Sequence, residues 1–416
     1  MRAAAILHRW CWCLLWPAIA LADGHEYPVT FGAVIKAGRH EAEAFIRVDQ
    51  DAGLLEQVRL RAPTRRYSRF SGDGEFRRVG DQVIWDVPAD GGRLNYRVNL
   101  KHRRGSGGYD ARVENKWAIF RLDDLFPPAG ISQVDGSRSR SRLSIAAPDG
   151  WKTVTRYQQL DGRRWRVTNP KRKFDRPTGW AVTGRLNIRR DLIDGTQVTI
   201  AGPVGEGVQR VSMLALLRWT LPALLDIAPD APRRLLVVSA ADPMWRGGLS
   251  GPGSLFMHAD LPLLSEDGTS TLLHETVHAV LPVPTADDHD WIDEGLAEYL
   301  TLRLLERTGT ISPARFLAAV ERFRERGTTA DGVLTSQAAG AVTARAVALF
   351  HDLDAELVAA TDGAADIEAL AATLAKQREP IDLEALRAVT LELAGTASLP
   401  SLADEQLRAF RRQAEM

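Results

Sequence analysis

The sequence has 416 residues, of which 45% are hydrophobic and 25% are charged, with 53 basic and 53 acidic side chains. This composition is typical of a folded globular protein with two or three domains and argues against extended disorder. The two cysteines, Cys11 and Cys13, lie near the N-terminus. A disulfide framework, a cysteine nucleophile and a cysteine-ligated metal are therefore excluded for the rest of the chain.

The first 22 residues have the pattern of a secretory signal peptide. Arg2 and Arg9 precede an apolar run over 10–19, and small residues follow at 20–22. The alternative is an uncleaved membrane anchor, but the run is shorter than the roughly 20 apolar residues that span a bilayer. We therefore expect an exported protein, periplasmic or extracellular, without stable membrane insertion after cleavage.

Residues 23–205 are predicted to form an all-β domain, either a sandwich or a saddle-shaped sheet. Alternating polar and apolar residues recur in short runs, among them EAEAFIRV (41–48), RLNYRVNL (93–100) and TQVTIAG (196–202). This part carries 33 basic and 22 acidic residues, whereas residues 206–416 carry 18 and 31. The change predicts a domain boundary near residue 205. No aromatic residues accompany the arginines of 137–142, which argues against nucleic-acid binding.

Residues 206–416 are predicted to be mainly helical, which makes the fold class α+β. A helix is predicted over 211–225 and two strands follow, over 233–240 and 255–259. A Gly-rich turn over 245–254 separates the two strands. Further helices are predicted towards the C-terminus at 312–326, 340–360, 364–376 and 382–394.

The segment TLLHETVHAV (271–280) lies in a predicted helix over 269–281 that begins with a cap at Asp267 or Thr269. His274 and His278 are four positions apart, so their imidazoles share one face at a spacing that a tetrahedral zinc ion can bridge. Glu275 then lies beside the metal, where its carboxylate can take a proton from water that zinc activates. A pattern this short also arises by chance, on the order of once per hundred such sequences.

A second motif, DWIDEGLAEYL (290–300), offers the remaining groups. Glu294 can be a third zinc ligand, and two histidines with one glutamate are typical of a catalytic zinc site that keeps one position open. Glu298 lies one helical turn later and can accept a hydrogen bond from the free ring nitrogen of His274. The alternative for Glu298 is a solvated surface glutamate.

With these two motifs, the sequence resembles the gluzincin zinc metallopeptidases, especially the aminopeptidase N and glycyl aminopeptidase families. The resemblance extends over residues 25–395 and implies an N-terminal β domain followed by a thermolysin-like catalytic domain. It also implies that His274, His278 and Glu294 bind Zn²⁺, that Glu275 is the catalytic base, and that the substrate is a peptide or protein.

The segment GGLSGPGS (247–254) departs from these families. Ser250 stands where they have a glutamate that binds the free amine of the substrate, and the loss of that charge-assisted hydrogen bond argues against strict aminopeptidase activity. Gly247 and Gly248 can let an extended substrate pair with an edge strand, or they can form a plain turn.

A second departure affects the group that stabilises the oxyanion. Thr343 stands where these families have a tyrosine, and losing such a donor typically costs on the order of 10²–10³ in rate. The candidates to replace it are Arg345, His289 and His351, although each histidine is also explained as a surface or capping residue. Tyr299 is expected to pack in the core and to point away from the zinc face.

We therefore expect an exported zinc metallopeptidase in which Glu275 acts as the general base. The alternative is a catalytically weak or inactive relative that binds a protein or peptide, and the missing tyrosine favours it. Hydrolysis of a non-peptide substrate on the same scaffold is a third hypothesis. Glu275 favours an enzyme, because a purely structural zinc site does not need this residue. The oligomeric state is not predicted by any of these features.

Overall fold

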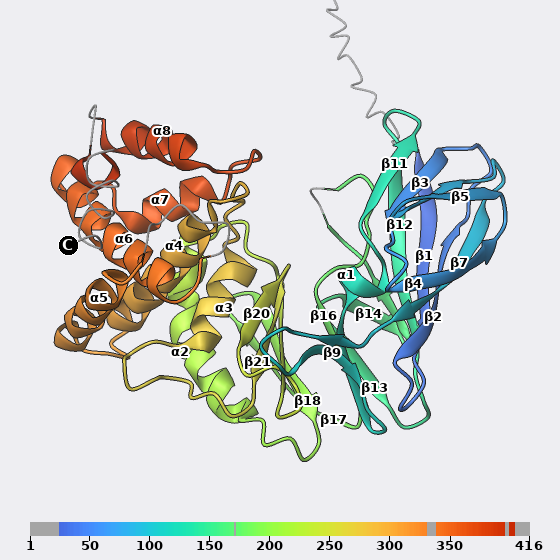
Figure 1. The fold of residues 1–416 in the computed structure, drawn as a ribbon, viewed down its shortest axis with the longest axis horizontal. Coiled ribbons are helices and arrows are strands. Elements are labelled where there is room, and N and C mark those ends of the chain that lie inside the picture. The colour runs from blue at the N-terminus through green and yellow to red at the C-terminus, as the bar shows by residue number, and fades with distance from the viewer. Residues whose placement is uncertain (1–24, 170–171, 331–337, 396–398, 404–416) are drawn as a thin grey trace, which may run out of the picture.

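The computed structural model describes residues 25–169, 172–330, 338–395 and 399–403. A β-rich N-terminal part lies beside a mainly helical C-terminal part, which confirms the α+β fold class (Figure 1). The predicted signal segment 1–22 lies outside the described residues. Within the described ranges, no helix combines the length and the apolar character needed to cross a membrane.

Three sheets build the N-terminal part. The first has seven strands in the order β14 (Gln158–Asp161), β15 (Arg164–Arg166), β12 (Arg138–Ala146), β1 (Glu26–Val34), β2 (Glu41–Val48), β7 (Gly92–Asn99), β4 (Tyr67–Gly72). The second has five, in the order β13 (Lys152–Thr155), β16 (Trp180–Gly184), β10 (Trp117–Arg121), β9 (Tyr109–Val113), β8 (His102–Arg103). The third has four, in the order β11 (Ala129–Gln133), β3 (Leu55–Arg61), β6 (Gln82–Asp86), β5 (Glu75–Val79).

The alternation of the sequence explains the burial of these strands. On β12, Ser139 and Ser141 are buried, whereas Arg138, Arg140 and Arg142 are exposed on the opposite face. Successive side chains of a strand point to opposite faces, so the repeated Ser-Arg pairs place the serines on the buried face of the sheet and the arginines on the exposed face.

A fourth sheet supports the helical part, in the order β17 (Leu186–Ile193), β18 (Thr196–Pro203), β19 (Arg234–Ala240), β21 (Ser254–His258), β20 (Gly248–Gly251). Its β18 is hydrogen-bonded in parallel to β19, so the sheet extends across the boundary that charge predicts near residue 205. The Gly-rich segment 245–254, predicted as a turn, contains β20, which pairs antiparallel with β21 and forms one edge of the sheet.

The helices of the C-terminal part enclose one large apolar core. They are α2 (Arg210–Ile227), α3 (Thr271–Val280), α4 (Asp290–Arg307), α5 (Pro313–Gly327), α6 (Ala341–Ala360), α7 (Ile367–Leu374) and α8 (Leu383–Ala394), with a short 3₁₀ turn at Pro400–Leu402. Trp291 of α4 stacks on Phe350 of α6 with ring centroids 6.1 Å apart, which fixes α4 beside α6. The cap of α3 is Ser270, whose hydroxyl accepts a hydrogen bond from the N–H of Leu273. The predicted cap at Asp267 or Thr269 was therefore wrong.

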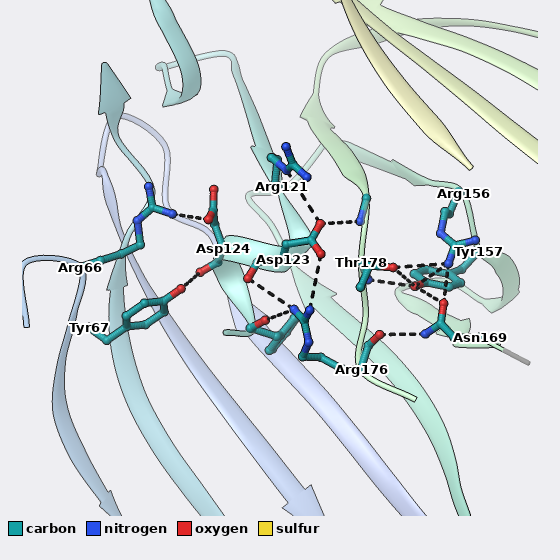
Figure 2. A network of polar contacts seen from close by, with 12 residues as sticks. Arg66, Tyr67, Arg121, Asp123, Asp124, Arg156, Tyr157, Asn169, Arg176 and Thr178 are labelled. Atoms are coloured by element: carbon teal, nitrogen blue, oxygen red, sulfur yellow. Dashed lines mark hydrogen bonds and ion pairs between the residues drawn. The ribbon is translucent and has the colours of Figure 1, made fainter. Parts of the chain in front are cut away.

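A polar network at the short helix α1 (Leu122–Leu125) holds the start of β16 (Figure 2). Asp123 accepts a hydrogen bond from the backbone N–H of Gly179 at 2.8 Å and lies 3.5 Å from the guanidinium of Arg176. Arg176 is buried and also donates to the carbonyl of Phe126. The network thus fixes the path of the chain into β16, and Trp180 is the first residue of that strand.

Two contacts from the N-terminal part hold β20. The indole N–H of Trp180 donates to the carbonyl of Leu249 at 2.8 Å. Three residues before β20 begins, the N–H of Trp245 donates to the carbonyl of Tyr109 at 2.8 Å. The edge strand is therefore positioned by residues of both parts of the molecule.

Candidate metal and catalytic centre

Helices α3 and α4 bring together His274, His278 and Glu294. One ligand atom from each lies within 4.8 Å of the others, and this is the one group of that kind found among the described residues. The Nε2 atoms of the two histidines are 3.1 Å apart. The carboxylate of Glu294 reaches both, with Oε2 at 3.4 Å from Nε2 of His274 and Oε1 at 3.7 Å from Nε2 of His278.

The spacing of these atoms fits a tetrahedral zinc ion. Zinc bonds to nitrogen and oxygen are about 2.1 Å long, which places tetrahedral ligand atoms roughly 3.4 Å apart. The three observed separations, 3.1, 3.4 and 3.7 Å, bracket that value. Two imidazoles and one carboxylate are ordinary zinc ligands, and a set of three is typical of catalytic sites, so the donor set fits Zn²⁺.

Each histidine has a carboxylate at its second ring nitrogen. Nδ1 of His274 lies 2.8 Å from Oε2 of Glu298, the residue that the sequence analysis assigned to this place. Nδ1 of His278 lies 3.1 Å from Oδ2 of Asp293, which the sequence analysis missed. The sequence does point to Asp293, because it directly precedes the proposed ligand Glu294. Metal-binding histidines almost always donate their second N–H to a carboxylate, a backbone carbonyl or water.

Burial and the neighbouring carboxylates act in opposite directions on the histidines. Burial lowers the pKa of His274, but hydrogen bonds to Glu294 and Glu298 outweigh it and raise this pKa to about 10. Burial also opposes the protonation of His278, yet Asp293 and Glu294 raise its pKa well above the ordinary value. The metal-free cluster therefore holds protons that a metal ion has to displace.

Glu275 lies beside these residues and is 7% exposed. Burial raises the pKa of its carboxyl, although the charges of His274 and His278 oppose the shift. The backbone N–H of Ser250 on β20 donates a hydrogen bond to it. Gly248 allows this close approach, because a Cβ there would lie 2.5 Å from Cγ of Glu275. A carboxylate whose pKa is raised in this way is suited to take up and return a proton.

A cleft of about 630 Å³ opens over the centre. Its walls come from β20, the helices α3, α4 and α5, and the start of α6, with Thr343 among the lining residues. The N-terminal part contributes one residue, Arg104, whose guanidinium lies over the ring of Trp245 at 4.1 Å from the centroid. Arg104 could not be predicted as part of the cleft from the sequence, because no local pattern links positions so far apart in the chain.

The three oxyanion donors proposed from the sequence, Arg345, His289 and His351, do not line this cleft. Arg345 is buried and donates to the carbonyl of Ala330 at 2.8 Å. His289 directly precedes α4, and His351 lies within α6, and neither lines the cleft. Thr343, which stands where the resembling families have a tyrosine, does line the cleft and carries a hydroxyl.

The structure also shows where the remaining residues considered from the sequence lie, namely Gly247, Gly248 and Tyr299. Gly248 lines the cleft, whereas Gly247 packs so closely on the ring of Trp245 that a Cβ would collide with it. Tyr299 is buried and donates its hydroxyl hydrogen to Oδ2 of Asp354 at 2.7 Å, so it belongs to the core.

Comparison with known proteins establishes the fold. No protein-family model matches the sequence, and no curated protein is matched by sequence. The structure is similar to that of an aminopeptidase N family protein from Idiomarina loihiensis, with a TM-score of 0.63 at 13% identity, covering 84% of this chain and 70% of that one. It is also similar to an M1 zinc metallopeptidase from Deinococcus radiodurans, with a TM-score of 0.58 at 15% identity, covering 93% of each chain.

A mutant form of the Deinococcus radiodurans enzyme gives a TM-score of 0.61 at 14% identity, covering 93% of this chain and 94% of that one. The two-part architecture of this chain is thus the fold of these metallopeptidases. The similarity extends over both the β-rich part and the helical part.

Proposed function

We propose that this chain is a zinc-dependent metallopeptidase that hydrolyses peptide bonds. The observation that carries the proposal is the arrangement around α3, where three ligand atoms have zinc spacing and the buried Glu275 lies beside them in a cleft. A purely structural zinc site needs neither a cleft nor an additional carboxylate. The fold shared with M1 zinc metallopeptidases supports the same proposal.

In this proposal, His274, His278 and Glu294 hold the zinc ion, which when bound supplies Lewis-acid activation of a water molecule and of the scissile carbonyl. Glu275 takes the proton that the attacking water loses as its oxygen bonds to the carbonyl carbon. It then gives that proton to the leaving amine nitrogen as the C–N bond breaks. The raised pKa of Glu275 suits it to both transfers.

The edge strand β20 positions the peptide. An extended substrate can add to the edge of a sheet through backbone hydrogen bonds, and Gly248 keeps that backbone close to Glu275. Ser250 offers no carboxylate for a substrate amine. We therefore infer that a free N-terminus is not required and that N-terminally blocked peptides are cleaved.

Thr343 is the group we propose at the oxyanion position of the cleft wall. Its hydroxyl can donate one hydrogen bond, but it is much shorter than a tyrosine side chain. Removing one oxyanion donor typically costs on the order of 10²–10³ in rate, so we expect slow turnover.

We also propose that the chain is exported to the periplasm or beyond. The support is the sequence pattern at residues 1–22, with two arginines, an apolar run and small residues at its end. Fractionation of cells that express the full chain tests this, and a full-length protein retained in the cytosol would contradict export.

Two measurements test the proposed activity. Metal analysis of the purified protein should give about one zinc per chain, and His274→Ala should lose most of it, because three protein ligands are needed. A digest of a blocked peptide library should show cleavage by the wild type and none by Glu275→Gln, which keeps the metal ligands. A zinc-free wild type, or equal cleavage by both proteins, would overturn the proposal.

A further inference from the structure

Three arginines line the cleft and the proposed hydrolysis uses none of them; two of the three, Arg104 and Arg326, have little or no compensation from carboxylates in the described ranges. Arg104 belongs to the loop between β8 and β9, and Arg326 lies near the end of α5. Both line the same cleft as Glu275. Two charged groups from distant segments therefore face one substrate-sized space.

Arg104 is held in a defined position by the β8–β9 hairpin. The hairpin docks on the catalytic part through two hydrogen bonds of Tyr109, whose N–H donates to Pro243 and whose carbonyl accepts from Trp245. Gly108 has φ +73°, and a Cβ there would lie 2.7 Å from Cα of Trp245, so the tight docking requires glycine. The guanidinium of Arg104 then lies over the indole, 4.1 Å from the ring centroid, and gains cation–π stabilisation.

The positive charge of Arg104 is only weakly compensated. Its nearest carboxylate, Asp110, lies 3.7 Å from Nη1. That carboxylate is in closer contact with Nδ1 of His102. Donor hydrogens of the guanidinium thus remain for a ligand in the cleft.

The positive charge of Arg326 is compensated even less than that of Arg104. It is exposed, and its guanidinium lies 4.6 Å from the ring centroid of Phe323. No carboxylate in the described part of the chain forms an ion pair with it. Arg322, one turn earlier on α5, differs because it is paired with Asp267 at 3.3 Å and donates to the carbonyl of the same residue.

Each acidic residue of the cleft either contacts a histidine or an arginine or is the proposed base. Asp293 and Glu298 hold the two histidines, and Glu294 is bonded to both of them. Glu275 is the proposed base, and Asp267 is paired with Arg322. The charges left to meet a ligand are therefore positive.

We propose that the cleft selects peptides that carry a carboxylate near the scissile bond and binds this carboxylate with Arg104 and Arg326. This inference rests on the proposed peptidase function and specifies its substrate class. Guanidinium groups recognise an aspartate or glutamate side chain and a peptide C-terminus by the same hydrogen-bonding geometry. Arg104 places a positive charge near Trp245, and Ser250 offers no carboxylate to bind a substrate amine. The cleft is therefore complementary to anionic peptide segments and not to a free amine.

Binding to zinc-loaded Glu275→Gln protein separates recognition from hydrolysis. Three N-terminally labelled pentapeptides are compared by fluorescence polarisation: a neutral amidated peptide, the same peptide with one glutamate, and the neutral peptide with a free C-terminus. We expect at least one carboxylate peptide to bind about fivefold more tightly than the neutral amide, and less so at high salt. Tighter binding of the glutamate peptide would identify an acidic side chain as the recognised group, and tighter binding of the peptide with a free C-terminus would identify the terminal carboxylate.

Arginine variants in the same background complete the test. Arg104→Gln and Arg326→Gln should each weaken binding of the favoured peptide by about fivefold, and Arg104→Lys should retain part of the gain. Arg103→Gln, which removes an exposed charge of β8 outside the cleft, should change nothing. Zinc content of each variant confirms that the site is intact.

The outcomes distinguish this inference from the function on which it rests. Equal binding of all three peptides, or binding that neither glutamine substitution weakens, would overturn the inference even if the wild type hydrolyses peptides. Arginine-dependent binding without any hydrolysis by the wild type would overturn the peptidase proposal and leave the carboxylate site standing.

Discussion

Gly248 lies directly against Glu275, because a Cβ on this glycine would be 2.5 Å from Cγ of the glutamate and 2.6 Å from Cγ2 of Thr271. Real Cβ atoms do not approach other atoms so closely, so Gly248→Ala must displace the proposed base or the edge strand. Displacement by about 1 Å can cost on the order of 100-fold in rate. We expect kcat on a blocked peptide to fall by that order while zinc content stays unchanged.

The same strand offers a matched control for this substitution. A Cβ at Gly251 would meet its nearest atom, Cα of Gly179, at 3.6 Å, which is ordinary contact. Gly251→Ala should therefore keep kcat within about twofold of the wild type. Equal kcat values for the two alanine variants would contradict the role assigned to Gly248.

Asp293 should be needed for tight zinc binding although it is not a ligand. Its carboxylate orients His278 through Nδ1 at 3.1 Å, and removing such a partner typically weakens metal affinity about 10- to 100-fold. Competition with a chromophoric chelator measures this loss in Asp293→Asn. Asp287→Asn, an exposed aspartate in the loop before α4, should bind zinc like the wild type. Unchanged affinity in Asp293→Asn would remove Asp293 from the site.

Zinc binding should release protons and strengthen as the pH rises. Hydrogen bonds to Glu294 and Glu298 hold the pKa of His274 at about 10 despite burial, so the metal-free protein keeps this proton at neutral pH. The raised pKa stabilises the metal-free fold fully below about pH 6.5, and this contribution is lost as the pH approaches 10. Titration calorimetry in buffers of different ionisation enthalpy measures the release. Binding without proton release at pH 7 would contradict the protonated cluster.

Local patterns predict many of the regular elements and the three residues that the structure brings together as a candidate metal site. The run EAEAFIRV corresponds residue for residue to β2, and the helix expected at 312–326 is α5, Pro313–Gly327. Alternation and helical periodicity are properties of neighbouring residues, so sequence carries them directly. The spacing of His274 and His278 is of the same kind, since one helical turn sets it.

Features that depend on distant contacts were not predictable in this way. The glycines of β20 disfavour a strand and so predict a turn, but pairing with β21 outweighs that preference. Arg104 enters the cleft only because a hairpin of the N-terminal part docks on Trp245. Net charge predicts a boundary near residue 205, and the pairing of β18 with β19 across that position could not be predicted from it, because strand pairing does not follow net charge.

Tyr299 should contribute to stability and not to catalysis. Its hydroxyl donates to Asp354 at 2.7 Å inside the core, and Asp354 also accepts a hydrogen bond from the N–H of Ile367. Tyr299→Phe leaves the buried carboxylate with one hydrogen bond fewer, which costs about 2 kcal/mol of unfolding free energy. Urea denaturation measures the loss, and kcat should stay within about twofold. A large fall in kcat at unchanged stability would instead identify Tyr299 as a catalytic group.

The network at α1 should stabilise the fold through Asp123 and Arg176 (Figure 2). Arg176 has a side chain 8% exposed, and Asp123 is its carboxylate partner at 3.5 Å. Asp123→Ala leaves a buried guanidinium without that partner, and breaking such a pair costs about 3 kcal/mol. Urea denaturation should show this loss, with a lower midpoint than the wild type. The two backbone carbonyls that remain near Arg176 limit the loss but do not neutralise its charge.

A surface pair in the same part of the molecule provides the comparison. Asp161 pairs with Arg164 across β14 and β15, and both side chains are more than half exposed to solvent. Asp161→Ala should leave the urea midpoint unchanged, since exposed ion pairs are screened by water. If Asp123→Ala shifts the midpoint no more than Asp161→Ala does, the buried pair does not stabilise the fold. Because the network leads into Trp180 and so to Leu249 on β20, Asp123→Ala should also lower kcat by several-fold under conditions in which it remains folded.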